Sequence, residues 1–198
     1  MRGGIRVTGQ STKERIIQAA IDLFHERGYQ AATTKAISER AGINEVTLFR
    51  HFGNKEGLMK AVIDTFSIPE HLLNRIDTHL KGDLEHDLPF LVRQYHEIVE
   101  QKEQVILISL KEAGTFPELD ELIAHIPTVY KERLKTYFKQ MVANGKIRQE
   151  DPETLATSFM YINFGYFFLK NRIDASKGPI PLDSFIENNI ALFIRSIQ

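Results

Sequence analysis

Hydrophobic residues recur at spacings of three and four over most of the chain, which is the periodicity of amphipathic α-helices. In the first such segment Ile16, Ala20 and Leu23 fall on one face, and Gly28 ends the pattern. No run of four to eight residues alternates between apolar and polar side chains as a β-strand would. The pattern predicts an all-α fold of about nine helices. The predicted helical segments are 12–28, 34–41, 45–51, a fourth over 55–66 that resumes over 70–80 after an interruption at Ser67 and Pro69, and then 84–102, 104–113, 118–144, 152–173 and 183–197.

Short polar residues mark the beginnings of these helices. The first has Ser11 or Thr12 as its N-cap, with Arg15 at the position where a capping box would place an acidic residue. Pro127 should kink or divide the helix predicted over 118–144, because proline lacks the N–H that an interior turn requires. The N-caps predicted for the next three helices are Thr33, Asn44 and Asn54.

Residues 1–53 hold three short predicted helices, and only a three-residue turn separates the second from the third. A helix-turn-helix needs a small residue where the two helices cross, supplied here by Ser38 or Ala41. It also needs a turn residue that tolerates positive φ, supplied by Gly42. The third helix has a diameter that fits the major groove of DNA. The apolar residues that would hold the pair together are Ile37, Ile43, Leu48 and Phe52.

Charge is distributed unevenly, although the net charge of the 198-residue chain is only −1. Residues 1–60 carry ten Lys and Arg against six Asp and Glu, whereas residues 61–198 carry fifteen against twenty. The basic N-terminal part favours a polyanionic partner such as DNA. The absence of cysteine excludes disulfides, thiol nucleophiles and thiolate metal sites. Because no long apolar run or signal-peptide pattern is present, the sequence predicts a cytoplasmic protein without a membrane span.

Residues 12–60 resemble the DNA-binding domain of the TetR family of bacterial transcriptional regulators, through the ordered run A-G-I-N-x-x-T-L-F-x-H-F-x-N-K-E-x-L. The resemblance implies a homodimer that binds a palindromic operator in double-stranded DNA, and repression is the commoner mode of action in the family. It also implies a larger C-terminal helical domain that binds a small ligand and dimerises. We therefore expect a disordered arm over 1–11, a helix-turn-helix domain over 12–53, and a ligand-binding and dimerisation domain over 54–198. The helix that begins after Asn54 joins the two domains.

The resemblance assigns roles to individual positions in the N-terminal domain. The recognition helix is Glu45–His51, and Thr34 and Lys55 correspond to phosphate contacts of the family. Arg50 and neighbouring hydroxyl groups lie at the flanks of the helix, where phosphates would be. The predicted DNA contacts are Thr33, Thr34, Lys35, Asn44, Glu45, Val46, Thr47, Phe49, Arg50, His51 and Lys55.

Three positions depart from the family pattern. Phe49 stands where tyrosine is common, so no phenolic hydroxyl reaches a phosphate from there. Val46 replaces a common glycine and adds apolar surface that could contact a thymine methyl. Gly57 replaces a common glutamate and weakens the first turn of its helix by roughly 1 kcal/mol of helix propensity.

The helix predicted over 152–173 is apolar around most of its circumference, so it must be covered on more than one side. The last predicted helix also carries an apolar stripe. The simplest arrangement packs both helices against their symmetry mates in a four-helix dimer interface, and Gly165 would allow close approach. A monomeric core is the alternative. The predicted interface residues are Phe159, Phe167, Phe185, Asn189, Ile190, Phe193 and Ile197.

The resemblance also implies a ligand pocket among the helices of the C-terminal domain. Few acidic or basic residues interrupt the apolar faces there, which favours a hydrophobic or aromatic effector. Such a ligand would act by a population shift that changes the separation of the two recognition helices and hence operator affinity. The candidate ligand contacts are Tyr95, His96, Phe116, His125, Tyr130, Tyr161, Asn163 and Tyr166.

Two other functions stay open at this stage. An enzyme is the first, but the sequence lacks the GxGxxG, GxxxxGK[ST], GxSxG, HExxH and calcium-loop motifs, so we expect neither catalysis nor a cofactor. His71 with His79, or His96 with Glu97 and Glu100, have spacings typical of a solvated helix face, and no metal site is predicted. The second alternative is a non-specific architectural DNA-binding protein, which would be basic throughout rather than acidic after residue 60.

Overall fold

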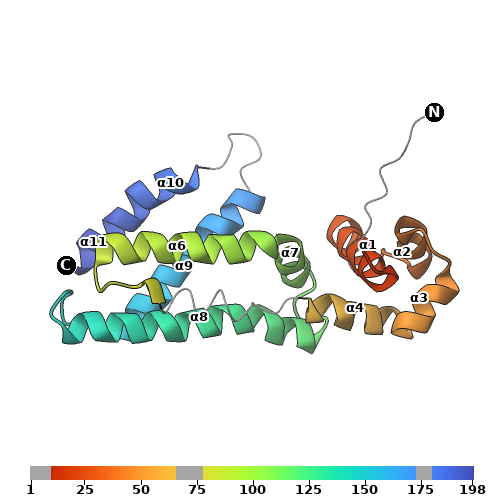
Figure 1. Ribbon diagram of the computed structural model, residues 1–198, viewed down its shortest axis with the longest axis horizontal. Coiled ribbons are helices and arrows are strands. Elements are labelled where there is room, and N and C mark those ends of the chain that lie inside the picture. The colour runs from red at the N-terminus through yellow and green to blue at the C-terminus, as the bar shows by residue number, and fades with distance from the viewer. Residues whose placement is uncertain (1–9, 66–77, 173–179) are drawn as a thin grey trace. The chain divides into compact units, whose positions relative to one another are not determined.

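The computed structural model of the protein describes residues 10–65, 78–172 and 180–198, and every element in these ranges is helical (Figure 1). The predicted all-α class is therefore confirmed. The described residues form two compact units. Unit 1 comprises the residues up to Thr65 together with Lys102–Ile123, and unit 2 comprises the rest. Within the described part of the chain, no helix is both long enough and apolar enough to cross a membrane.

Unit 1 is organised around α1, which contacts α2, α4 and α7. Its core contains the fully buried side chains of Ile16, Phe24, Ile37, Leu48 and Leu58. The helices of unit 1 are α1 (Thr12–Arg27), α2 (Thr34–Ala41), α3 (Glu45–Phe52), α4 (Lys55–Asp64), α7 (Glu103–Lys111) and the first part of α8 (Pro117–Ala143).

Local hydrogen bonds fix where the helices of unit 1 begin. The hydroxyl of Ser11 accepts the N–H of Glu14, while the Glu14 carboxylate accepts the N–H of Ser11. This is a complete capping box, so the expectation that Arg15 stands at its acidic position is wrong, because the box counts from Ser11. The predicted N-caps of the next three helices, Thr33, Asn44 and Asn54, are confirmed.

Segment 102–123 belongs to unit 1, whereas the sequence predicts that the first domain ends at residue 53. Two contacts explain the difference. The carboxylate of Glu112 accepts the N–H of Tyr29 at 2.9 Å, and the ring of Phe116 meets the Tyr29 ring edge-on with centroids 4.6 Å apart. Gly28 permits this approach, since a Cβ there would lie 3.2 Å from a carboxylate oxygen of Glu112.

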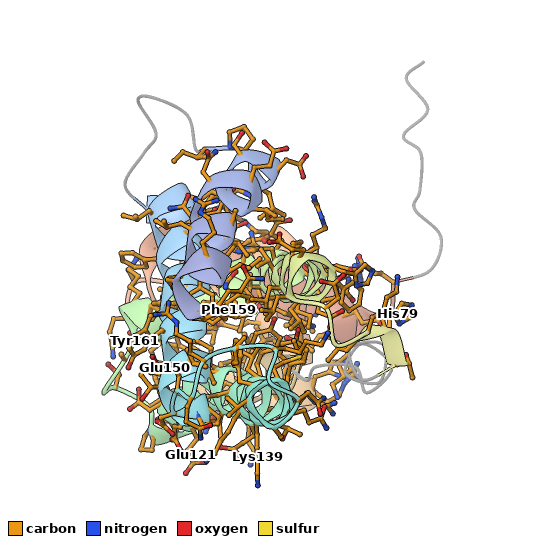
Figure 2. The ribbon with its side chains drawn as sticks, turned by 90° about the vertical axis from the view of Figure 1, so that its left-hand side faces the viewer. His79, Glu121, Lys139, Glu150, Phe159 and Tyr161 are labelled. Atoms are coloured by element: carbon orange, nitrogen blue, oxygen red, sulfur yellow. The ribbon has the colours of Figure 1, made fainter. Side chains whose placement is uncertain are left out.

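In unit 2, α6 lies between α8 and the last helical segment, which consists of α10, η1 and α11 (residues 182–197), as both views show (Figures 1 and 2). Helix α9 also packs against α6. The helices of this unit are α6 (Leu84–Gln101), the later part of α8, α9 (Pro152–Arg172), α10 (Leu182–Phe185), η1 (Ile186–Ile190) and α11 (Ala191–Ile197).

Three helix predictions in the C-terminal part have different outcomes. Pro127 does not divide α8, which runs unbroken from Pro117 to Ala143. The loss of one hydrogen bond is outweighed there by the side chains that the helix buries farther on, such as Phe138. The last predicted helix contains a π-helical turn over Ile186–Ile190. The predicted helix 70–80 falls mostly outside the described residues.

A fully buried carboxylate, that of Asp87, is the polar centre of unit 2. It accepts the backbone N–H groups of residues 81–83 at 2.8 to 3.1 Å and the hydroxyl of Tyr137 at 3.2 Å. Burial acts to raise the pKa of Asp87, but the hydrogen bonds from His86, from the backbone and from Tyr137 lower it overall. One side chain thus holds the turn before α6 and joins α6 to α8.

Candidate nucleic-acid interface

Helix α3 presents an exposed face formed by Val46, Phe49 and Arg50. These positions are three and four residues apart, so their side chains lie together on one side of the helix. Val46 is 75% exposed and Phe49 is 42% exposed, whereas Leu48 is fully buried and anchors α3 in unit 1. The face combines a cation, which can bind phosphate or guanine, with apolar groups that can contact a thymine methyl.

The orientation of α3 relative to α2 is fixed by a short turn. Gly42 adopts the left-handed conformation, with φ 67° and ψ 40°, which confirms the prediction of positive φ at this position. The N–H of Ile43 donates to the carbonyl oxygen of Ser38 at 3.0 Å. The hydroxyl of Thr34, at the start of α2, donates to the carboxylate of Glu45, at the start of α3. The two helix N-termini are therefore held together from within the motif.

Lys55 begins α4, and its ammonium group is held within unit 1. The ammonium lies 4.3 Å from the centroid of the Tyr29 ring and donates to the carbonyl oxygen of Gln30 at 3.3 Å. Burial lowers the pKa of Lys55, and the nearby Glu112 carboxylate acts in the opposite sense. Glu112 also accepts the N–H of Tyr29, so segment 102–123 and Lys55 meet at the same residue. A phosphate would compete with the Tyr29 ring and the Gln30 carbonyl oxygen for this ammonium.

The predicted DNA contacts differ in how accessible they are in this structure. Thr33 and Asn44 are exposed, but their side-chain oxygens accept backbone N–H groups as N-caps. The other exposed side chains are those of Lys35, Val46, Phe49, Arg50 and His51. The half-buried ones are Thr34, Glu45, Thr47 and Lys55. The sequence offers no sign of the roles of Tyr29 and Glu112, because they are 83 residues apart in the chain.

Five of the predicted ligand residues come together in unit 2. The ring of Tyr95 lies 5.3 Å from that of Tyr130 and 5.2 Å from that of His96. The His96 ring lies 5.0 Å from that of Tyr166, and Asn163 is close enough to His96 to influence its pKa. Burial raises the pKa of both Tyr95 and Tyr130, and burial lowers the pKa of His96 to about 4.

The other three predicted ligand residues do not join this group. Phe116 belongs to unit 1, where it contacts Tyr29. Tyr161 is 71% exposed on α9. The side chain of His125 lies outside the described residues. In the described ranges, no three His, Asp or Glu side chains gather in a way that could hold a metal ion.

Six of the seven predicted dimer-interface residues are buried within their own chain, at 8% exposure or less, because they form the core between α6, α8, α9 and the last helical segment. Asn189 is the exposed one. Figure 2 shows Phe159 in the interior of the unit and Tyr161, two residues later, at its outer edge. The buried six are Phe159, Phe167, Phe185, Ile190, Phe193 and Ile197.

A different face of α9 is exposed and apolar. It consists of Tyr161, Phe164, Gly165, Phe168 and Leu169, which are spaced as neighbours on one side of a helix. The rings of Phe164 and Phe168 are stacked with centroids 6.2 Å apart, and no atom of the chain comes within 4 Å of a Cβ placed at Gly165. We call this set the α9 outer face. The helical spacing of these residues can be seen in the sequence. The sequence does not show which face of α9 is exposed, because the buried face is equally apolar.

Two family models match the chain. Residues 16–62 match the bacterial regulatory proteins of the tetR family, and residues 86–195 match the C-terminal domain of AefR-like transcriptional repressors. An uncharacterized HTH-type transcriptional regulator, YvkB of Bacillus subtilis (strain 168), is 34% identical over 189 residues, which cover 94% of this chain and 97% of YvkB.

Solved structures of regulators share the fold. A TetR transcription regulator from Haloarcula marismortui superposes with a TM-score of 0.69 at 16% identity, covering 94% of this chain and 97% of the other. The transcriptional regulator FadR of Bacillus subtilis, solved in complex with stearoyl-CoA, gives a TM-score of 0.67 at 17% identity, with 93% and 98% covered. These relatives are regulators rather than enzymes. The chain belongs to the TetR family of transcriptional regulators, and its N-terminal helix-turn-helix is a DNA-binding element.

Proposed function

We propose that the protein is a repressor that binds a palindromic operator as a homodimer through α3 and is released by a small apolar or aromatic effector. The observation that carries the DNA-binding part is the exposed face of Val46, Phe49 and Arg50 on a helix whose opposite side is locked into unit 1. Residues on such a face can enter a major groove without disturbing the core. A twofold dimer matches the two half-sites of a palindrome.

The α9 outer face is the surface that we assign to the dimer. Tyr161 is 71% exposed and Leu169 is 51% exposed, an unusual degree of exposure for large apolar side chains on one stripe. Gly165 in its middle leaves space for a close helix approach. Two copies of such a stripe would bury each other in the four-helix arrangement expected from the sequence.

Release by an effector needs a connection between the ligand-binding helices and the DNA contacts. Segment 102–123 continues directly from α6 and contains the first turns of α8. Its Glu112 accepts the N–H of Tyr29, whose ring holds the ammonium of Lys55. A ligand that favours one placement of α6 and α8 would therefore change how readily Lys55 is given up to a phosphate.

The effector proposal rests on the aromatic cluster of unit 2, in which Tyr95, Tyr166 and Phe185 surround His96. The stearoyl-CoA bound by the FadR structure shows that a protein of this fold can hold a ligand with a long apolar chain. It does not fix the ligand of this chain, because the two proteins are 17% identical.

DNA binding is tested by gel shift with the promoter regions of the chain's own gene and its neighbours, with unlabelled competitor at two salt concentrations. We expect Arg50→Ala to weaken specific binding by roughly 10- to 100-fold, the effect of losing one base or phosphate contact in each half-site. Arg93→Ala is the matched control, because Arg93 pairs with Asp183 in unit 2 at 2.7 Å. Equal binding of every sequence would instead favour a non-specific architectural protein.

The dimer face is tested by sedimentation equilibrium. Phe164→Glu should convert the dimer into a folded monomer, since a charge would be buried without a partner at the interface. Val46→Glu places the same charge on an exposed apolar site of α3 and should leave the dimer intact. A dimer that tolerates Phe164→Glu would place the interface elsewhere.

A further inference from the structure

Among the described residues, three polar atoms in the interior of unit 2 have no hydrogen-bonding partner of good geometry, although Asn163 lies close enough to His96 to influence its pKa. They are both ring nitrogens of His96 on α6 and the side-chain oxygen Oδ1 of Asn163 on α9. His96 is 1% exposed and Asn163 is fully buried. Buried polar atoms are almost always paired, because an unpaired one loses its water without replacement. Their presence on two facing helices therefore leaves hydrogen-bonding capacity at this site that no described residue satisfies.

The surroundings of these atoms are aromatic. The rings of Tyr95, Tyr166 and Phe185 lie with their centroids 5.2, 5.0 and 6.2 Å from that of His96. Nearby hydroxyl donors are directed elsewhere, since Tyr166 donates to the carbonyl oxygen of Ile180 and Tyr130 donates to that of Leu91. The walls thus favour a flat or apolar ligand body and leave its polar group to His96 and Asn163.

The site carries no net charge. Burial lowers the pKa of His96 to about 4, so the imidazole is neutral at pH 7. The charged groups that act on it, Glu100 and Lys170, pair with each other at 2.6 Å and oppose each other in effect. A carboxylate or phosphate placed here would lose its hydration without gaining a cation of its own.

The donors and acceptors specify the missing group further. A neutral imidazole offers one N–H and one acceptor nitrogen, and the amide nitrogen of Asn163 already donates to the carbonyl oxygen of Phe159 at 2.8 Å. If the His96 N–H turned to Asn163 Oδ1, the other ring nitrogen would still lack a donor. In either arrangement the site needs a group that donates, and a hydroxyl can donate and accept at once.

We propose that His96 and Asn163 form the polar anchor of the effector site and that the effector is an uncharged aromatic or aliphatic molecule with a hydroxyl group, a phenol or an alcohol. This deepens the proposed function and rests on the presence of an effector. The two helices that the hydroxyl joins, α6 and α9, supply the aromatic walls together with Phe185 of α10.

The test compares three probes of one shape on the full-length protein without DNA: 4-propylphenol, propylbenzene and 4-propylbenzoate. Calorimetry should give an affinity for the phenol roughly tenfold higher than for propylbenzene, and the benzoate should be the weakest. The side-chain nitrogen resonances of His96 should shift when the phenol is added. Preferential binding of the benzoate, or equal binding of phenol and propylbenzene, would overturn the proposal; the second result is also what a site filled by water predicts.

Variants assign the preference to the two side chains. His96→Leu and Asn163→Leu should each bind phenol and propylbenzene equally, whereas Asn171→Leu, which removes from α9 an amide that donates to the carbonyl oxygen of Phe167, should keep the preference. A phenol preference that survives in both leucine variants contradicts the anchor. The nitrogen resonances of the wild-type protein provide a readout that does not depend on the variants folding.

Operator binding is measured separately, with and without 4-propylphenol. Release of DNA supports both proposals. Binding of the phenol at His96 without any effect on the operator complex would preserve the anchor and contradict release by the effector. An operator complex that dissociates with the benzoate alone would contradict the anchor and preserve release.

Discussion

The helix N-caps of unit 1 bond to residues three positions away, whereas two buried polar side chains of unit 2, Asp87 and His96, respectively reach across the fold and lack a partner among the described residues. Ser11, Thr33, Asn44 and Asn54 each accept an N–H three residues later in the chain. In unit 2 the Asp87 carboxylate is joined to Tyr137, 50 residues away, and the ring nitrogens of His96 have no partner in the part of the chain that the structure describes. Local pairing suits a rigid reading element, and unpaired interior atoms suit a site that awaits a ligand.

The largest effect that we expect from this comparison is a pH dependence of the free energy of unfolding that is caused by His96 in unit 2. The folded-state pKa of His96 is lowered from 6.5 to about 4, so between these values the unfolded chain binds the extra proton. Unfolding should therefore become easier as pH falls from about 7 to 4, by up to roughly 3 kcal/mol from this residue. Denaturant unfolding of His96→Gln should show a flatter pH profile over that range.

The control for this effect is Tyr130→Phe, because the pKa of Tyr130 is raised well above its ordinary value and the residue does not titrate there. This variant should keep the wild-type pH profile while losing some stability at every pH. A His96→Gln profile as steep as that of the wild type would show that the imidazole gains its proton without cost in the folded protein.

The second prediction tests whether local helix propensity determines stability at Gly57 in unit 1. Helix propensity predicts that Gly57→Ala stabilises α4 by roughly 1 kcal/mol. The structure predicts the opposite, because a Cβ at Gly57 would lie 2.1 Å from the carbonyl oxygen of Phe52. We expect a loss of about 2 kcal/mol in the free energy of unfolding, as for other overpacked sites.

Gly165→Ala on α9 is the matched substitution, since its Cβ would meet no atom of the chain within 4 Å. It should gain a little helix stability in the monomer. If Gly57→Ala raised the free energy of unfolding, the turn before α4 would be able to relax. If Gly165→Ala lowered it, the loss would have to come from a partner packed on the α9 outer face.

The smallest predicted effect concerns Ser38, a polar residue of unit 1 whose side chain does not follow the capping pattern of its neighbours. The hydroxyl of Ser38 is buried at the crossing of α2 and α3, and no described residue forms a hydrogen bond with it. Ser38→Ala should therefore raise the free energy of unfolding by about 0.5 to 1 kcal/mol, through helix propensity and the removal of an unpaired group. Thermal unfolding and gel shift should together show a more stable protein with unchanged operator affinity. A loss of stability would reveal a partner for the hydroxyl.

The same contrast explains what could be predicted from the sequence. The helix-turn-helix was predictable because its caps, its turn at Gly42 and its buried Leu48 are local features with fixed spacing. The contact between Glu112 and Tyr29 was not, because no local pattern marks two residues that meet only after folding. The unit boundary was misplaced for the same reason.

In the C-terminal part, the sequence pattern could not separate the buried face of a helix from its exposed face. Helix α9 is apolar on both sides, so periodicity could not decide whether Phe159 or Phe164 faces outward. The selection of His96 and Asn163 as polar residues on apolar faces placed them in one region correctly. That both retain unpaired atoms could be seen only when neighbouring helices were in place.

Because α7 and the beginning of α8 complete unit 1, the reading element is assembled from two stretches of chain with all of α6 between them. A ribosome must therefore synthesise more than half of the protein before the first helix finds its last neighbours. A fragment that stops at residue 65 would lack Glu112 and Phe116 and would leave the Tyr29 ring uncovered. Transplanting this DNA-binding specificity onto another regulator would have to carry the second stretch along with the first.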